Sequence, residues 1–310
     1  MNYCPITLEA ITDSELYSQK GLHWLSPTLK ELKPLDFSAA DLRQEAMRRA
    51  AKISIQGVQP KLSARLVPSQ SQFEIVDKGG TYILKPPSEL WPELPANEAL
   101  TMTLGKTIGL DTPLHGLVYN KDKDFVYFIK RFDRFNKNQK HAVEDFAQLS
   151  MLTRETKYRS SMEKVAKIIT AYCSFPMKEK IKLFTLTLFS YVVGNEDMHL
   201  KNFSIIQKDD LITISPVYDL LNTSIALESV SEELALPLHG KKHKLTRDDL
   251  LEYFGKEVLG LTNKLIDSIV EKFLTTQTTW GKLIQQSKLS QQMQQKYYEL
   301  LDTRMSVLKS

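Results

Sequence analysis

Hydrophobic and polar residues follow one pattern up to about residue 133 and a different one after it. In the first part, short runs rich in β-branched and aromatic residues are separated by turn residues such as Gly79-Gly80. This pattern is typical of β-strands joined by turns. The predicted strands cover residues 62–67, 73–76, 81–84, 116–120 and 125–131. We expect them to form one mostly antiparallel sheet.

Helical patterns interrupt this first part and then dominate the second. Residues 41–52 are strong helix formers. Residues 96–108 place Leu100, Leu104 and Ile108 on one apolar face, because residues four apart lie on the same side of a helix. Further helices are predicted at residues 143–152, 161–172, 177–193, 264–274 and 291–308, and another begins at the capping-box-like sequence Thr246-Arg-Asp-Asp249.

One β-hairpin is predicted within the helical part. Residues 203–207 and 211–215 are short β-like runs on either side of Lys208-Asp209-Asp210. The sequence therefore predicts an α+β fold with two lobes. A small β-rich N-terminal lobe covers residues 1–133, and a larger α-helical C-terminal lobe covers residues 134–310.

Composition and charge narrow the class of protein. The 310 residues carry a net charge of +4, too small an excess for nucleic-acid binding by bulk electrostatics. Cys4 and Cys173 lie far apart, which argues against a disulfide framework or a cysteine zinc site and favours a reducing compartment. The longest apolar run, residues 183–193, is well short of the ~18 residues that span a bilayer. No signal peptide is visible, so we expect a cytoplasmic protein without a membrane anchor.

The most informative polar sequence follows the apolar run. Asp197 and Asn202 are five residues apart, the spacing of a phosphotransferase catalytic loop, in which the aspartate accepts a hydroxyl proton and the asparagine binds Mg²⁺. The spacing alone is weak, because such pairs occur by chance in many loops. Asp219 follows the predicted hairpin and would be the second metal ligand, as the kinase order of residues requires. The alternative makes Asp197 a surface carboxylate and Asp219 a turn residue.

The β-rich lobe contains candidates for a nucleotide site. Lys85 ends an apolar strand and Glu98 opens the next helix, as in the kinase lysine–glutamate pair. Alternatively, Lys85 is an edge residue whose ammonium reaches solvent. The strand that ends at Lys130 would be the hinge, with backbone groups from Ile129 to Phe132 meeting adenine. The ring of Phe132 would pack on the adenine base or close the hydrophobic core.

The segment before the first long strand lies where a phosphate-covering loop belongs. It reads Lys52-Ile-Ser54-Ile-Gln-Gly57-Val-Gln-Pro-Lys61 and holds a single glycine, so it is neither a dinucleotide-binding fingerprint nor a P-loop. Its spacing alone indicates only a turn.

Together these segments resemble the HipA-like serine/threonine kinases, the toxins of bacterial toxin–antitoxin modules, and most closely the short HipT form. The matching pieces appear in family order from about residue 50 to residue 225, and residues 238–246 fit the region beyond. They are Ile53-Ser-Ile-Gln-Gly-Val-Gln-Pro-Lys-Leu, Ile83-Leu-Lys-Pro, Pro95-Ala-Asn-Glu98, Arg131-Phe-Asp-Arg134, residues 194–204 and Tyr218-Asp219-Leu.

The resemblance implies a bilobal protein-kinase-like fold and an enzyme that uses ATP and Mg²⁺. Asp197 would be the catalytic base, Asn202 and Asp219 the metal ligands, and Lys85 the phosphate-binding lysine with Glu98 as its partner. The resemblance also makes Ser54 an autophosphorylation site. A phosphoserine adds about −1.5 to −2 charges, so we expect the modification to disable or regulate the enzyme.

Further site residues and partners are implied by the same resemblance. Gln59, Lys61 and His199 join the cofactor-binding set, with His199 expected to orient the catalytic loop. The expected partners are a helix-turn-helix antitoxin of the HipB kind, through which alone DNA would be contacted, and a small HipS-like protein that replaces an N-terminal domain of the longest family members. The implied substrate is an aminoacyl-tRNA synthetase, glutamyl- or tryptophanyl-, on a serine.

Alternatives remain at this stage. A lipid or small-molecule kinase of the same fold would also lack a glycine-rich loop, and a catalytically silent corepressor would bind the antitoxin without turnover. A local basic cluster could meet a phosphorylated or tRNA-associated surface, but a solvated loop is the favoured interpretation. Its members are His239, Lys241, Lys242, His243, Lys244 and Arg247.

Overall fold

The computed structural model describes residues 2–50, 59–136, 139–153, 155–227 and 232–309. The chain divides into two compact units. Unit 1 holds residues 1–100, 113–140 and 283–291, and unit 2 holds residues 101–112, 141–282 and 292–310. The lobe boundary at residues 133 and 134 stays a prediction of the sequence.

Unit 1 is built on a five-stranded sheet with the order β4-β3-β5-β7-β6, in which all neighbours are antiparallel. The predicted antiparallel sheet is therefore confirmed. Its strands are β3 (Leu62–Val67), β4 (Gln72–Ile75), β5 (Tyr82–Lys85), β6 (His115–Tyr119) and β7 (Phe125–Lys130), and the 3₁₀ turn η1 (Pro68–Gln70) joins β3 to β4.

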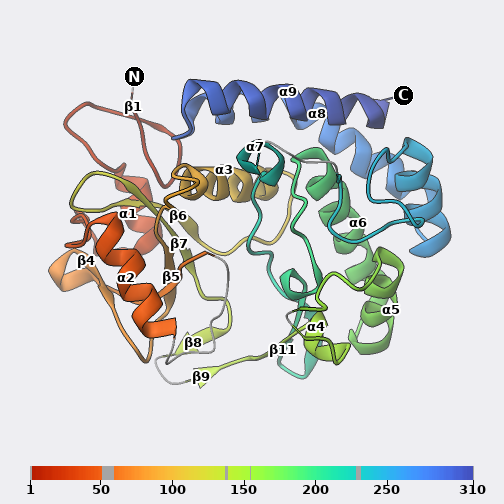
Figure 1. Cartoon of the computed structure of the whole chain (residues 1–310), viewed down its shortest axis with the longest axis horizontal. Helices are drawn as coiled ribbons and strands as arrows, with labels where there is room; N and C mark the ends of the chain where they lie inside the picture. Colours follow the sequence, from red (N-terminus) through yellow and green to blue (C-terminus); the bar gives the residue numbers. More distant parts are fainter. Residues whose placement is uncertain (1, 51–58, 137–138, 154, 228–231, 310) are drawn as a thin grey trace. The chain divides into compact units, whose positions relative to one another are not determined.

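The N-terminal residues complete the core of unit 1. The short strands β1 (Asn2–Tyr3) and β2 (Ala10–Ile11) precede two helices, α1 (Gln19–Leu25) and α2 (Ala39–Ala50), which lie beside the sheet (Figure 1). Apolar side chains of both helices join strand residues in one buried cluster. The members include Leu22, Leu25, Leu42, Ala46, Leu62, Leu84, Val126 and Phe128. Helix α2 begins two residues before its predicted start, and α1 was not predicted.

Unit 2 is mainly helical. Its helices include α5 (Met162–Tyr172) and α6 (Pro176–Val192), both close to their predicted ranges. Three helices have residues in both units. They are α3 (Leu94–Thr107), α8 (Asn263–Gln286) and α9 (Gln291–Lys309). Trp280 of α8 is fully buried and meets the ring of Phe189 of α6 edge-on, with centroids 5.7 Å apart. Most residues of α6 from Leu183 to Val192 are buried, so this helix contributes much of the core of unit 2.

The predicted helix at residues 143–152 is wrong. Residues Ala142–Asp145 form strand β10, and only Phe146–Leu149 are helical, as α4. Asp145 caps α4, because its side chain accepts from Gln148 N and the Gln148 side chain accepts from Asp145 N. This reciprocal cap fixes the helix start after the strand. Exposure alternates along β10, which is the pattern of a strand with one buried face.

The predicted hairpin is confirmed and belongs to a three-stranded sheet. Strands β11 (Ser204–Lys208) and β12 (Leu211–Ile214) pair antiparallel, and β10 adds to β11. Asp209 and Asp210 connect them with φ of 47° and 62°, the left-handed conformation that a two-residue hairpin turn uses.

The helix predicted to begin near Thr246 is present, but it is a π-helix, η3 (Asp249–Val258). Thr246 and Asp249 bond each other's backbone N–H at 3.0 and 3.2 Å, as expected of a capping box. The remaining elements are β8 (Arg134–Asn136), β9 (Gln139–Lys140), the 3₁₀ turn η2 (Leu200–Asn202) and α7 (Thr223–Leu227). Among the described helices, none has the length and apolarity to cross a bilayer.

Candidate active site

Lys85 and Glu98 form a buried ion pair in unit 1. Lys85 ends β5 and Glu98 lies in the first turns of α3, and Nζ is 2.5 Å from Oε1. The two side chains are only 3% and 1% exposed. Tyr127 lies opposite Lys85 in the β5–β7 register, with its ring centroid 5.4 Å from Nζ. Buried charges persist only when they are paired, so this contact explains how a lysine can end an apolar strand.

The predicted hinge lies at the end of β7. Ile129 is buried in the strand and Phe132 is half-buried just beyond it. The backbone N–H of Lys130 donates to Leu114 O at 2.7 Å, while its side chain is exposed. One of the backbone donors expected to meet adenine is therefore engaged inside unit 1.

The phosphate-covering segment is only partly described. Gln59 and Lys61 lie just before β3 and are half-buried. Gln59 Nε2 is buried and has no hydrogen-bond partner within the part of the chain that the structure describes. Ser54 falls in residues 51–58, outside the described residues.

A glycine shapes the loop that carries Asp197 in unit 2. Gly194 has φ +68°, and a Cβ there would lie 2.5 Å from both Leu300 Cδ2 and Ser224 Oγ. The left-handed conformation favours glycine, and a side chain there would also have to displace Leu300 and Ser224. The loop is also tied to α7, because Glu196 N donates to Thr223 Oγ1 at 2.8 Å and Thr223 N donates to Gly194 O at 3.0 Å.

Asp197 and Asn202 are joined within this loop. The side-chain amide Nδ2 of Asn202 donates to the backbone oxygen of Asp197 at 2.8 Å. This bond uses the amide nitrogen, so Oδ1 is the atom of this side chain that could bind a metal. The Asp197 side chain is 44% exposed, and its Oδ1 accepts a hydrogen bond from the hydroxyl of Tyr158.

His199 is buried beside Asp197. Its Nε2 lies 3.7 Å from Asp197 Oδ1 and 2.6 Å from Lys157 Nζ. Burial lowers the pKa of His199 and the Lys157 ammonium lowers it further, against the opposing effect of Asp197. The imidazole is therefore neutral at neutral pH, and Nε2 accepts from Lys157. These contacts suit a residue that orients the loop.

Asp219 is brought toward the same loop by its neighbour. Tyr218 donates its hydroxyl to Lys201 O at 2.8 Å and lies 2.5 Å from Ser204 Oγ. Asp219 itself has φ +54°, and its charge acts on His199. Unit 2 thus gathers the predicted base, both predicted metal ligands and His199.

Lys157 and Tyr158 were missed by the sequence reasoning. They lie in an irregular stretch between α4 and α5, with no motif spacing to link them to Asp197. The available signal was compositional: a lysine next to a tyrosine in a polar segment just before a helix.

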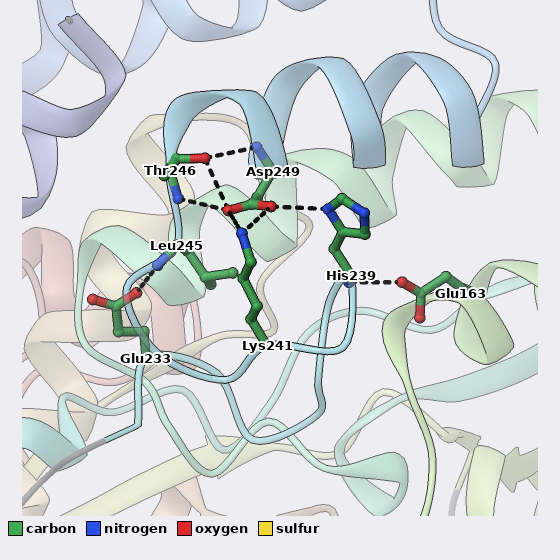
Figure 2. A network of polar contacts seen from close by, with 7 residues as sticks. All are labelled: Glu163, Glu233, His239, Lys241, Leu245, Thr246 and Asp249. Carbon is green, nitrogen blue, oxygen red and sulfur yellow. Dashed lines mark hydrogen bonds and ion pairs between the residues drawn. The ribbon is translucent and has the colours of Figure 1, made fainter.

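Three members of the basic cluster contact acidic side chains of the surrounding loop and helix start. Figure 2 shows Lys241 reaching both carboxylate oxygens of Asp249, at 2.9 Å each. His239 Nδ1 lies 2.9 Å from the same carboxylate, and Lys242 pairs with Glu232. Burial by itself would raise the pKa of Asp249, but these hydrogen bonds and those from Thr246 hold it below its usual range. These contacts hold His239, Lys241 and Lys242 within a folded loop.

Comparison with known proteins identifies the family of the chain. Residues 53–280 match the family model described as HipA-like C-terminal domain. A Haemophilus influenzae protein named "Putative kinase" is 30% identical over 323 residues, covering 94% of this chain and 93% of its own length.

Two solved structures share the fold. One is HipA in the Shewanella oneidensis complex of HipA, HipB and operator DNA, with a TM-score of 0.70, 21% identity and coverage of 90% of this chain and 72% of that one. The other is the Helicobacter pylori proinflammatory kinase CtkA, with a TM-score of 0.58, 16% identity and coverage of 83% and 92%. The predicted α+β kinase-like fold is confirmed, and the chain belongs to the family defined by the HipA-like C-terminal domain.

Proposed function

We propose that this protein is an ATP- and Mg²⁺-dependent serine/threonine-protein kinase that acts as the toxin of a toxin–antitoxin module. The observation that carries the proposal is the Lys85–Glu98 pair, 2.5 Å apart and almost fully buried. A buried pair is weak support for stability, because desolvation offsets much of its attraction. In kinases this pair has a chemical purpose, since the lysine binds nucleotide phosphates and the glutamate holds it in place.

The donor set fits the proposed cofactors. Asn202 Oδ1 and the Asp219 carboxylate are hard oxygen ligands of the kind Mg²⁺ prefers. No cluster of three or more metal-binding side chains occurs among the described residues, and Mg²⁺ held mainly by phosphates needs only one or two protein ligands. Gln59 Nε2, buried without a hydrogen-bond partner in the described ranges, is a further donor suited to phosphate. When bound, the metal would neutralise charge on the phosphates.

The residues of the chain then have separate roles. Asp197 accepts the proton of the attacking serine hydroxyl, and Lys85 balances phosphate charge while Glu98 fixes its position. Lys61 adds positive charge near the phosphates, and backbone groups around Ile129 and Phe132 meet the base. Little covalent chemistry is required of the protein, because phosphoryl transfer depends mainly on positioning and electrostatic stabilisation.

The finer parts of the proposal concern regulation and partners. Ser54 is the proposed autophosphorylation site, and an aminoacyl-tRNA synthetase is the proposed substrate. The structural neighbour in complex with HipB and operator DNA supports a HipB-like antitoxin as partner, with DNA contacted only through it. A small HipS-like protein is a second proposed partner, and the cytoplasm is the proposed location.

The test is intact-mass measurement and phosphopeptide mapping after incubation of the full chain with ATP and Mg²⁺. Wild type should gain phosphate on Ser54, and Asp197→Asn should gain none. Asp248→Asn is the matched control, because Asp248 is an exposed carboxylate in the helix-start segment after Thr246. Absence of phosphate, both added and already present, in wild type would reject the kinase and favour the corepressor.

A further inference from the structure

The Tyr158 hydroxyl donates to the same carboxylate that the proposed function makes the catalytic base. Tyr158 lies in the stretch between α4 and α5, and this stretch is bonded to the loop of Asp197 through Leu200 N and Lys157 O at 3.4 Å. Burial and the hydrogen bond to Asp197 both raise the pKa of Tyr158. The hydroxyl is therefore protonated at neutral pH and acts as a donor.

The two oxygens of Asp197 are used differently. Oδ1 accepts from Tyr158 and has His199 Nε2 at 3.7 Å, whereas Oδ2 has no hydrogen bond within the described part of the chain. A general base must lie within hydrogen-bond reach of the proton that it removes. The geometry thus fixes the carboxylate through one oxygen and leaves the other for an incoming hydroxyl.

Lys157, the residue before Tyr158, contacts His199 and the ring of Tyr158. Its Nζ is 2.6 Å from His199 Nε2 and 5.0 Å from the ring centroid of Tyr158. The rings of Tyr158 and His199 meet edge to face at 5.0 Å and 86°. Adjacent residues of one segment therefore contact the side chains of Asp197 and His199, so that neither side chain can rotate without breaking a contact.

We propose that Tyr158 is a positioning residue, which holds the Asp197 carboxylate for proton transfer, and that Lys157 supports it through His199. This inference rests on the proposed kinase function. A base that can rotate spends less time aligned with the acceptor, and small misplacements lower the rate of a positioned reaction steeply. The effect therefore belongs to the chemical step, and ATP binding should not depend on it.

The test compares Tyr158→Phe with wild type in steady-state phosphotransfer. Phenylalanine keeps the ring and removes only the donor, so we expect kcat to fall about 10-fold or more while the KM for ATP and the melting temperature stay unchanged. Lys157→Met should lower kcat less. The double variant should lose less than the product of the two single effects, because both act on one contact network. Tyr172→Phe is the control, since Tyr172 is 44% exposed at the end of α5.

The outcomes separate the two levels of the proposal. If wild type transfers phosphate and Tyr158→Phe is equally fast, the positioning role is rejected. If Tyr158→Phe is faster, the positioning role is also rejected, and Tyr158 instead blocks access of the acceptor to Asp197. A parallel loss of melting temperature and rate would show a structural role instead. If wild type transfers no phosphate, the kinase proposal fails and takes this inference with it.

Discussion

Two lysine–carboxylate pairs in this chain have similar contact distances and a buried carboxylate, but they differ in the exposure of the lysine. Lys85 and Glu98 are 2.5 Å apart and both are buried. Lys241 and Asp249 are 2.9 Å apart, but the lysine is 47% exposed while the carboxylate is 4% exposed. In the second pair the lysine keeps much of its hydration, and Asp249 also caps the start of η3 through Thr246. The comparison shows that the first pair is costly and needs a reason beyond stability, whereas the second is explained by the loop that it folds.

The largest expected effect comes from breaking the buried pair. Glu98→Gln leaves the Lys85 ammonium buried without its partner charge, which should lower the free energy of unfolding by about 3–5 kcal/mol. Urea unfolding followed by circular dichroism measures this loss. A change below about 1 kcal/mol would mean that the site admits water and that the pair is not truly buried.

Replacing both Lys85 and Glu98 by apolar residues tests whether the buried pair serves stability or phosphate transfer. The double variant Lys85→Met/Glu98→Leu should recover most of the stability lost by Glu98→Gln, because apolar replacements of buried ion pairs are often neutral or stabilising. Its phosphotransfer rate should remain about 10²-fold or more below wild type, as for the loss of a charge-stabilising donor. Unfolding and transfer assays on the same preparation check this. Recovered activity would contradict a phosphate role for Lys85.

The pair with the exposed lysine should respond more mildly. Asp249→Asn loses charge-assisted bonds from Lys241 and weakens the cap at Thr246, at a cost of about 1–3 kcal/mol in unfolding free energy. Asp248→Asn, an exposed neighbour, should change it by less than about 0.5 kcal/mol. Equal effects of the two substitutions would remove the structural role assigned to Asp249.

The contribution of Asp249 to the free energy of unfolding should decrease gradually as the pH is lowered. Its pKa in the folded protein lies below the ordinary value of 3.8, so its stabilisation is fully present above that value. The stabilisation is lost as the pH falls through the folded-state pKa, because the protonated form favours the unfolded chain. The stability difference between wild type and Asp249→Asn should therefore shrink below pH 3.8. If the stability difference between wild type and Asp249→Asn grew in acid instead, the pKa of Asp249 would not be lowered in the folded protein.

The sequence predicted elements whose pattern is local. The strands of unit 1 are short apolar runs between turns, and helix α6 contains one long apolar run. The hairpin at Asp209-Asp210 has a recognisable turn. Strand β10 was predicted as a helix because residues 143–152 contain good helix formers, while its pairing with β11 depends on residues about sixty positions away. Its alternating exposure became visible only in the folded structure.

The candidate site also contains residues that local sequence patterns predicted and residues that they did not. Asp197, Asn202, Asp219, Lys85 and Glu98 were predicted from ordered spacing and a family resemblance. Tyr158 reaches Asp197 across 39 positions, and no periodicity or short motif encodes such a contact. Tertiary contacts of this kind become visible only when the fold is known.

Gly194 has a consequence for the order in which the protein is made. The space above its Cα is filled by Leu300 of α9, so α9 forms one wall of the loop that holds Asp197. A ribosome adds α9 after every residue of the loop, because α9 follows the loop along the chain. The loop therefore gains its final packing only after α9 has been synthesised, and a nascent chain that ends before α9 would lack the packed arrangement around Asp197.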